Sequence, residues 1–164
     1  MFLPHDTGPP DIVEIERALS RVAQLLTRYR RHGRTVAAAG VPVDRAAVPV
    51  LRVLADAGGP VRMNEIAAEL GVEAPHVTRQ VQRLEQVGYV ERVPDPGDRR
   101  AQRVLLREQG REAFARVRAV ALGWMDEALG HWTPGDRAAL AELVNRMVDD
   151  FNAHDWDDAR ETRA

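Results

Sequence analysis

The sequence predicts a mainly α fold with a small β-wing, in which a winged helix-turn-helix is flanked by N- and C-terminal helices. The prediction rests on the segment from Val61 to Arg107. Two short stretches there carry apolar residues at helical spacing around a glycine, and two further segments then surround a turn rich in proline and glycine. Helix, turn, helix and two-stranded wing is an arrangement that places one helix in a DNA groove.

The helix-turn-helix is expected at Met63–Leu70 and at about Ala74–Gln86. Gly71 separates the two helices, because glycine can take the positive φ that ends a helix in a turn. The expected inward face of the second helix consists of Val77, Val81, Leu84 and Val87. Two strands are then expected at Tyr89–Val93 and Gln102–Leu106, around a loop with turn-forming residues at its tip.

Helices are expected on both sides of this motif. Apolar residues repeat at intervals of three and four from Ile12 to Tyr29, which predicts a helix ending near His32. Such a narrow seam packs in a bundle, either within the chain or with another subunit. A shorter helix is expected after Asp44, its N-cap, and Pro49 means that this helix either starts there or is kinked.

After the wing, a helix is expected over residues 109–130. A last helix begins at Thr133, because a threonine N-cap followed by a proline is a typical helix start. The expected organisation is a disordered lead-in at 1–10, one domain at 11–152 and a disordered acidic tail at 153–164. Within the domain, the winged helix-turn-helix region is assigned to 44–107 and the flanking helices to 11–33 and 108–152.

Composition excludes several classes of site. The 164 residues include no cysteine, and all 23 basic residues are arginine. Disulfides, thiolate metal sites, Schiff-base lysines and the P-loop lysine are therefore excluded. The histidines lack metal-ligand spacing, no catalytic motif is present, and no apolar run approaches the roughly 20 residues of a membrane span. We expect no cofactor, no metal, no catalysis and no membrane segment.

The charge is unevenly distributed along the chain, although the net charge is only −2. Arginines outnumber acidic residues from His76 to Arg107, whereas acidic residues outnumber arginines from Asp126 to the end. This asymmetry suits a protein that offers one face to phosphates and keeps the other away from them.

Three features of the sequence are found together in one family: the order of the helices, the pattern GVxxxxVTRxVxxLExxGYVER, and the wing sequence DPGDRR followed by VLL. In these features the sequence resembles the MarR (multiple antibiotic resistance regulator) family of bacterial repressors. It spans roughly Ile12 to Phe151. The resemblance implies a cytoplasmic homodimer whose terminal helices are dimerisation helices, and a small effector, often an anionic aromatic, that binds between those helices and the DNA-reading module.

The recognition helix is expected to offer its outward face to double-stranded DNA. Arginine can make a bidentate contact to guanine and glutamine to adenine, which favours Arg79 and Gln82 as base contacts. The full outward set is Pro75, His76, Thr78, Arg79, Gln82 and Arg83. Ordinary solvated residues of a surface helix are the alternative interpretation of this set.

The resemblance also implies roles in the wing. Asp98 is expected to pair with Arg100, so that Arg100 enters the minor groove, while Arg99 meets a phosphate. Arg92 and Arg103 are either phosphate contacts or solvated strand residues. The effector candidates are Trp124, which would stack on an aromatic ligand, and Arg28 and His32, which would pair with a carboxylate.

Three positions depart from the family's pattern. The family usually has Ser or Thr capping each helix of the reader, and this chain has Arg62 and Glu73 there. Arg107 stands where a capping Thr usually follows the second wing strand. The function expected is a ligand-responsive repressor that binds a pseudo-palindromic operator as a dimer. The alternative is a winged-helix module that docks to protein rather than to DNA.

Overall fold

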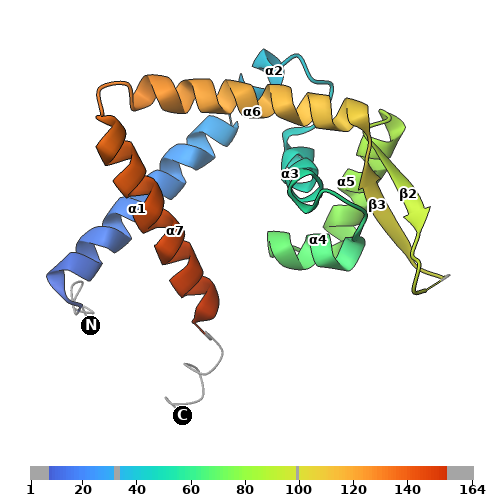
Figure 1. Cartoon of the computed structure of the whole chain (residues 1–164), viewed down its shortest axis with the longest axis horizontal. Helices are drawn as coiled ribbons and strands as arrows, with labels where there is room; N and C mark the ends of the chain where they lie inside the picture. The colour runs from blue at the N-terminus through green and yellow to red at the C-terminus, as the bar shows by residue number, and fades with distance from the viewer. Residues whose placement is uncertain (1–7, 32–33, 99, 155–164) are drawn as a thin grey trace, which may run out of the picture. The chain divides into compact units, whose positions relative to one another are not determined.

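The computed structural model describes residues 8–31, 34–98 and 100–154, with the backbone alone at 28–31 and 34–35. The elements, in chain order and as Figure 1 labels them, are α1 Pro10–Arg31, α2 Arg34–Ala38, η1 Arg45–Ala47, α3 Val48–Ala57, β1 Val61–Arg62, α4 Met63–Leu70, α5 Ala74–Gln86, β2 Val90–Pro94, β3 Gln102–Leu106, α6 Glu108–Ala128 and α7 Pro134–Ala153. Two compact units divide the chain after Ala121, within α6.

The mainly α fold with a winged helix-turn-helix is confirmed, but the sheet has one strand more than predicted. Its order is β1-β3-β2, and both pairings are antiparallel. In the register, Val61 lies opposite Val104, and Arg92 lies opposite Val104 on the other side. The two predicted strands of the wing are confirmed as β2 and β3, whereas the two-residue strand β1 is too short to show an alternating pattern and was not predicted.

The core of the first unit lies between α3, α4, α5 and the sheet (Figure 1), with the first turns of α6 added. Its fully buried large side chains are Leu51, Leu54, Ile66, Leu84, Leu106, Val50, Val77, Val81, Val90 and Val104. Asp44 caps η1 by accepting a hydrogen bond from the backbone N–H of Ala46 at 3.0 Å. Pro49 then occupies the first turn of α3, so the helix starts there rather than being kinked.

Close packing between α6 and the wing depends on Gly110, which is buried in the first turn of α6. A Cβ at this position would collide with the carbonyl oxygen of Tyr89 and lie 2.7 Å from Cδ1 of Leu106. Only glycine lets the start of α6 lie this close to β2 and β3. Arg107 joins the same elements, because its backbone N–H donates to the Tyr89 carbonyl at 2.9 Å.

The second unit contains the end of α6 and the whole of α7. The predicted start signal of α7 is confirmed, because the Thr133 hydroxyl accepts from the Asp136 N–H at 3.1 Å. The Asp136 carboxylate in turn accepts from the Thr133 N–H at 3.2 Å, which completes a capping box. Arg137 pairs with Asp126 of α6 at 3.1 Å.

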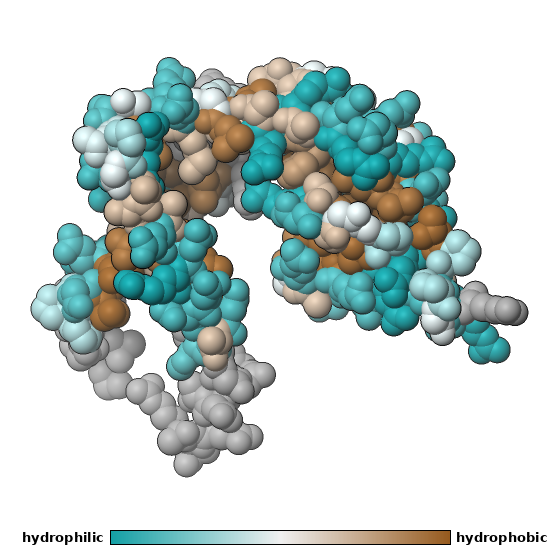
Figure 2. Space-filling model, viewed as in Figure 1, coloured by the Kyte–Doolittle hydropathy of each residue, from teal (hydrophilic) through white to brown (hydrophobic). Residues whose placement is uncertain are grey.

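Apolar side chains on α7 are exposed, and none of its residues is buried. Figure 2 shows patches of hydrophobic surface among hydrophilic surface in this part of the molecule. The exposed set on α7 is Leu140, Leu143, Val144, Val148 and Phe151, and a similar set on α1 is Ile12, Ile15, Val22, Leu25 and Leu26. Throughout the described part of the chain, no helix combines the length and apolar character needed to cross a bilayer.

Candidate nucleic-acid interface

The helix α5 presents two faces of opposite character. Val77, Val81 and Leu84 have no exposed surface, as predicted for the inward face. Val87 was also expected to point inward, and this prediction was wrong because 39% of it is exposed. The helix ends at Gln86, so Val87 leaves the helical spacing as its C-cap, and Gly88 at φ 75° completes the turn.

The outward face carries the residues predicted to contact DNA. Pro75, Arg79, Gln82 and Arg83 are exposed, whereas His76 and Thr78 are half-buried. A shallow hollow of about 550 Å³ lies beside the first turns of α5, and it is lined by Ala74, Pro75, Thr78 and Arg79. Three of the predicted contact residues therefore gather at the N-terminal end of the helix, the part that meets base edges in helix-turn-helix complexes.

Two residues of that face have partners within the protein. The Thr78 hydroxyl donates to the Ala74 carbonyl at 3.0 Å and lies 3.8 Å from the sulfur of Met63. The Arg83 guanidinium pairs with Asp44 at 2.9 Å, between exposed side chains. Among the described residues, the side chains of Arg79 and Gln82 have no hydrogen bond or ion pair that would hold them back from a ligand.

Gln80 is the buried polar residue of α5 that the sequence did not reveal. Only 5% of it is exposed, and its Oε1 atom accepts no hydrogen bond within the described part of the protein. Because glutamine is polar, the pattern of apolar residues did not predict its burial, although it stands between Val77 and Val81. Burying an amide oxygen without a donor costs free energy.

The wing is organised by Asp95, whose side chain has no exposed surface. Its Oδ2 atom accepts hydrogen bonds from Nε of Arg62 at 2.6 Å and Nε of Arg103 at 2.7 Å. Its Oδ1 atom accepts from the backbone N–H groups of Gly97 at 2.8 Å and Asp98 at 3.2 Å. The hydrogen bonds from the two guanidinium groups hold the pKa of Asp95 far below its usual value, so the carboxylate is ionised.

Asp98 contacts Arg100 through the backbone. Its Oδ1 atom accepts from the Arg100 N–H at 2.9 Å, which closes a turn of the loop. The guanidinium of Arg100 has no partner among the described residues, and the residue is exposed. The expected pairing therefore shapes the loop rather than orienting the arginine fork. Arg99 lies outside the described residues.

Arg92 and Arg103 are engaged in ion pairs, which neither interpretation from the sequence included. Arg92 pairs with Glu85 of α5 at 3.2 Å, and so connects the recognition helix to β2. Arg103 pairs with Asp95, and its Nη1 atom also lies 3.4 Å from the Pro60 carbonyl oxygen. These pairs link segments distant in the sequence, which is why spacing alone did not indicate them.

Comparison with known proteins places this geometry in a family. A model of the MarR family matches residues 41–101, which contain the whole helix-turn-helix. The HTH-type transcriptional regulator Mb0904 of Mycobacterium bovis is 30% identical over 112 residues, an alignment covering 66% of this chain and 78% of the relative. The chain belongs to the MarR family.

Two further relatives match a shorter part of the chain, and a solved structure is similar in fold alone. The HTH-type transcriptional regulators BilQ of Clostridioides difficile and YwoH of Bacillus subtilis are 32% and 33% identical, and the chain spans 42% and 65% of their lengths. The alignments cover 38% and 55% of this chain. A MarR family protein from Bacillus stearothermophilus has the same fold, with a TM-score of 0.75, 18% identity and coverage of 90% of this chain and 99% of that one.

The positions that depart from the MarR pattern have no side-chain caps. Arg62 precedes α4, and the only capping contact there is the Arg62 N–H donated to Glu65 Oε2 at 3.0 Å, because a guanidinium cannot accept a hydrogen bond. Glu73 precedes α5 and makes no side-chain cap. Arg107 precedes α6, and its guanidinium pairs with Glu91 of β2 at 2.8 Å.

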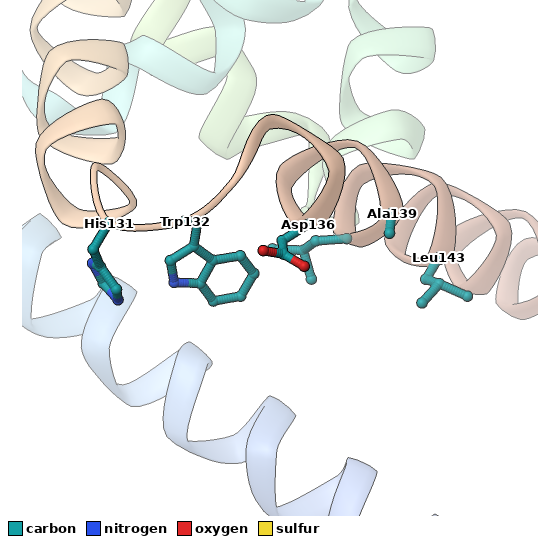
Figure 3. A pocket seen from close by; sticks show the side chains of 6 residues that line it. His131, Trp132, Asp136, Ala139 and Leu143 are labelled. Carbon is teal, nitrogen blue, oxygen red and sulfur yellow. The ribbon is translucent and has the colours of Figure 1, made fainter.

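The residues expected to bind an effector are only partly covered by the structure. The side chain of Arg28 and the whole of His32 lie outside the described residues. Trp124 is half-buried on α6 in the second unit. A different hollow, of about 520 Å³, opens in that unit (Figure 3), and Trp124 does not line it. Its lining is His131, Trp132, Asp136, Ala139, Leu140 and Leu143.

Metal binding finds no support in the described residues, since no three of their histidine, aspartate and glutamate side chains are grouped as metal ligands would be. Asp95, the most enclosed carboxylate of the wing, already has both oxygens occupied by arginine and backbone donors. The arginine and glutamine side chains exposed at this surface are able to hydrogen-bond to phosphate oxygens and to base edges.

Proposed function

We propose that the chain is a transcriptional regulator that binds double-stranded DNA. The observation that carries this proposal is the exposed face of α5, where Arg79 and Gln82 stand opposite a fully buried apolar stripe. A helix held rigidly by one face can insert the other into the major groove, where arginine and glutamine read guanine and adenine. The names of the relatives, all transcriptional regulators, agree with this function.

The wing would contact the adjacent minor groove. Its loop is fixed at both ends, because Asp95 accepts the N–H groups of Gly97 and Asp98, and Asp98 accepts that of Arg100. Arg100 is exposed at the end of this ordered turn. Arginine in a minor groove senses the groove's width and negative potential, and Arg99 would meet a phosphate.

The regulator would act as a homodimer in the bacterial cytoplasm. Apolar side chains on α1 and α7 are about half exposed, for example Ile12 at 54% and Leu143 at 53%. A second copy is the occupant that the dimeric MarR architecture provides for such faces. Two recognition helices about one DNA turn apart (~34 Å) would then read a pseudo-palindromic operator.

We also propose that the protein is a repressor released by a small anionic aromatic compound. Trp124 would stack on the ring, and Arg28 and His32 would neutralise the carboxylate. This proposal is supported by the effector binding expected of a MarR-family protein and by the half-buried position of Trp124. Titration of the DNA complex with salicylate-like acids should dissociate it, and Trp124→Ala should weaken that response without changing DNA affinity in the absence of ligand.

DNA binding is tested by measuring affinity for a duplex from the protein's own upstream region and for a random duplex of equal length. We expect the wild type to prefer its own region at moderate salt. Arg79→Ala should remove most of that preference, about 1–3 kcal/mol for one bidentate base contact. Arg118→Ala, an exposed arginine on α6, is the charge-matched control and should keep the preference.

Two results would reject the proposed function. One is equal affinity of the wild type for both duplexes, with or without candidate ligands. The other is an Arg79→Ala variant that retains full preference, since the recognition helix would then not read the sequence. Binding to neither duplex by a folded dimer would favour a winged-helix module that docks to protein.

A further inference from the structure

Arg62 and Arg103 form an unusual pair of like charges in the sheet. They are direct partners in the antiparallel register of β1 and β3, so their side chains project from the same face. Two like charges placed opposite each other repel. Asp95 removes that repulsion, since a single oxygen, Oδ2, accepts the Nε–H groups of both arginines at 2.6 and 2.7 Å.

Both oxygens of the Asp95 carboxylate between the two arginines accept hydrogen bonds. Asp95 is buried, and its other oxygen accepts the backbone N–H groups of Gly97 and Asp98. Two other acids, Glu65 and Asp98, lie near Arg62, but their carboxylates bind backbone N–H groups. Glu65 accepts the N–H of Arg62, and Asp98 accepts that of Arg100. Within the described chain, no second carboxylate is bound to either guanidinium.

The arginines remain partly open to solvent. The side chain of Arg62 is 39% exposed and that of Arg103 is 29% exposed. Each arginine uses its Nε–H on Asp95. Among the described residues, the only hydrogen bond made by their Nη groups is that from Nη1 of Arg103 to the Pro60 carbonyl oxygen, at 3.4 Å. Two positive charges share one buried negative charge, and the excess positive charge is held in a fixed orientation.

We propose that Arg62 and Arg103, held by Asp95, form a phosphate-binding site that contacts the DNA backbone between the two grooves. The proposal rests on the proposed function, because the ligand is the phosphate of the bound duplex. Planar guanidinium groups with an orienting carboxylate suit bidentate contact with phosphate oxygens. Asp95 acts as a positioning residue, since it touches the arginines and not the ligand.

The location of the site agrees with this ligand. Arg62 directly precedes α4, the first helix of the helix-turn-helix, and Arg103 lies on the wing strand β3. With α5 in the major groove and the wing in the minor groove, a sugar-phosphate strand must pass between them. Contacts to that strand fix the register of a protein on DNA without reading sequence. Arg62 stands where the family usually caps a helix, and this chain uses the position for charge instead.

The test measures DNA affinity by fluorescence anisotropy over a series of salt concentrations, with the full chain and both duplexes used above. Arg62→Gln and Arg103→Gln should each weaken binding about tenfold, equally for both duplexes, as expected for one charge-assisted contact. The slope of log affinity against log salt should fall by about 0.9 for each lost phosphate contact. Arg111→Gln, which removes an exposed arginine paired with Glu108 on α6, should change neither quantity.

The variant Asp95→Asn distinguishes the effect of arginine orientation on DNA affinity from the effect of net charge. The substitution removes a negative charge near the DNA, so electrostatics alone predicts tighter binding. The proposed orienting role predicts weaker binding, by several-fold, and a smaller salt slope. Asp95→Asn combined with Arg62→Gln should lose little more than Arg62→Gln alone, because the two changes disable the same contact. Tighter binding by Asp95→Asn would overturn the proposal.

A purely structural role for these residues is tested with Arg100→Ala. If Arg62→Gln acts only by displacing the wing, Arg100→Ala should add no loss to it, and that result would overturn the proposal. Additive losses support a separate phosphate contact. Unchanged affinity and slope in Arg62→Gln, in a protein that still depends on Arg79, would reject this site and leave the proposed function intact. If the wild type binds no duplex, both proposals fail together.

Discussion

The recognition helix α5 and the C-terminal helix α7 carry apolar stripes of similar length but differ in what covers them. In α5, Val77, Val81 and Leu84 are completely buried. In α7, Leu143 and Phe151 are 53% and 49% exposed, and the helix has no buried residue. A stripe that is covered within the chain builds a core, whereas one left open is complementary to another surface.

This difference separates two tasks within one chain. The α3–α5 and wing region can form its core from its own residues, so its stability depends on internal packing. The apolar stripes of α1 and α7 are about half exposed, and the second subunit of the homodimer we propose would cover them. Substitutions in the first region should therefore change unfolding, and substitutions in the second should change assembly first.

The largest effect is expected from Leu143→Asp on α7. A charge placed in the centre of the apolar stripe would be buried without a partner in the dimer, so we expect the variant to be a monomer. Two half-sites would then no longer be bound together, and affinity for the operator should fall by at least about a hundredfold. Sedimentation velocity and the DNA titration measure the two effects.

Asn145→Asp provides the matched control for that substitution. It adds the same charge to the same helix, but two residues further on, where the side chain points to the opposite face. The control should remain a dimer with nearly unchanged DNA affinity. If Leu143→Asp also remains a dimer, the exposed stripe of α7 is not the interface.

A substitution at Gly110 should have the next largest effect and should act on folding. Gly110→Ala would force α6 away from the Tyr89 carbonyl and Leu106, at a cost of about 2 kcal/mol of unfolding free energy. Gly123→Ala, where nothing lies within 4 Å of the added Cβ, should raise stability by about 0.5–1 kcal/mol. Urea unfolding at fixed protein concentration compares the two, and equal effects would contradict the close packing at Gly110.

Local signals were sufficient for much of this fold. Pro75 and Gly88 mark the two ends of α5, and Thr133 with Pro134 marks the start of α7. These ends were predictable because caps and turns involve residues that are close in the sequence. The alternation around the wing loop likewise predicted β2 and β3. The short helix α2 and the two-residue strand β1 were missed, since segments so short contain too few residues for a periodic pattern.

The candidate site was predictable only where a residue's role depends on its position along one helix. Arg79 could be assigned to the outward face of α5 by counting from Val77. The role of Asp95 could not, because its partners stand 33 residues before it and 8 residues after it, and only the sheet register brings them together. The sequence predicts the orienting carboxylate at Asp98, but this residue instead binds the backbone of Arg100.

Gln80→Met should have a smaller effect, and of the opposite sign to Gly110→Ala. The substitution replaces a buried amide, whose Oε1 accepts no hydrogen bond among the described residues, by an apolar side chain of similar length. Removing an unsatisfied acceptor should raise stability by about 1 kcal/mol. Gln82→Met on the exposed face is the control and should stay within about 0.5 kcal/mol of the wild type. Destabilisation by Gln80→Met would mean that the oxygen has a partner in solution.

The smallest effect is expected at the uncapped start of α5. Glu73 has φ −68° and ψ 141°, the extended conformation of an N-cap, but its side chain makes no capping hydrogen bond. A serine hydroxyl in this conformation would accept from the N–H of the second or third helical residue, as Thr133 does for α7. Glu73→Ser should therefore stabilise the protein by about 0.5 kcal/mol, after loss of the favourable carboxylate near the helix N-terminus.

The reciprocal substitution, Thr133→Ala, removes an observed cap and should cost about 1 kcal/mol. Thermal unfolding of both variants at one protein concentration gives the two values, because unfolding of a dimer depends on concentration. If Glu73→Ser destabilises the protein, the carboxylate at this position contributes more through the helix dipole than a hydroxyl can through one hydrogen bond. The cap at the start of the recognition helix would then be electrostatic, and this chain would differ from the MarR pattern in mechanism as well as in residue.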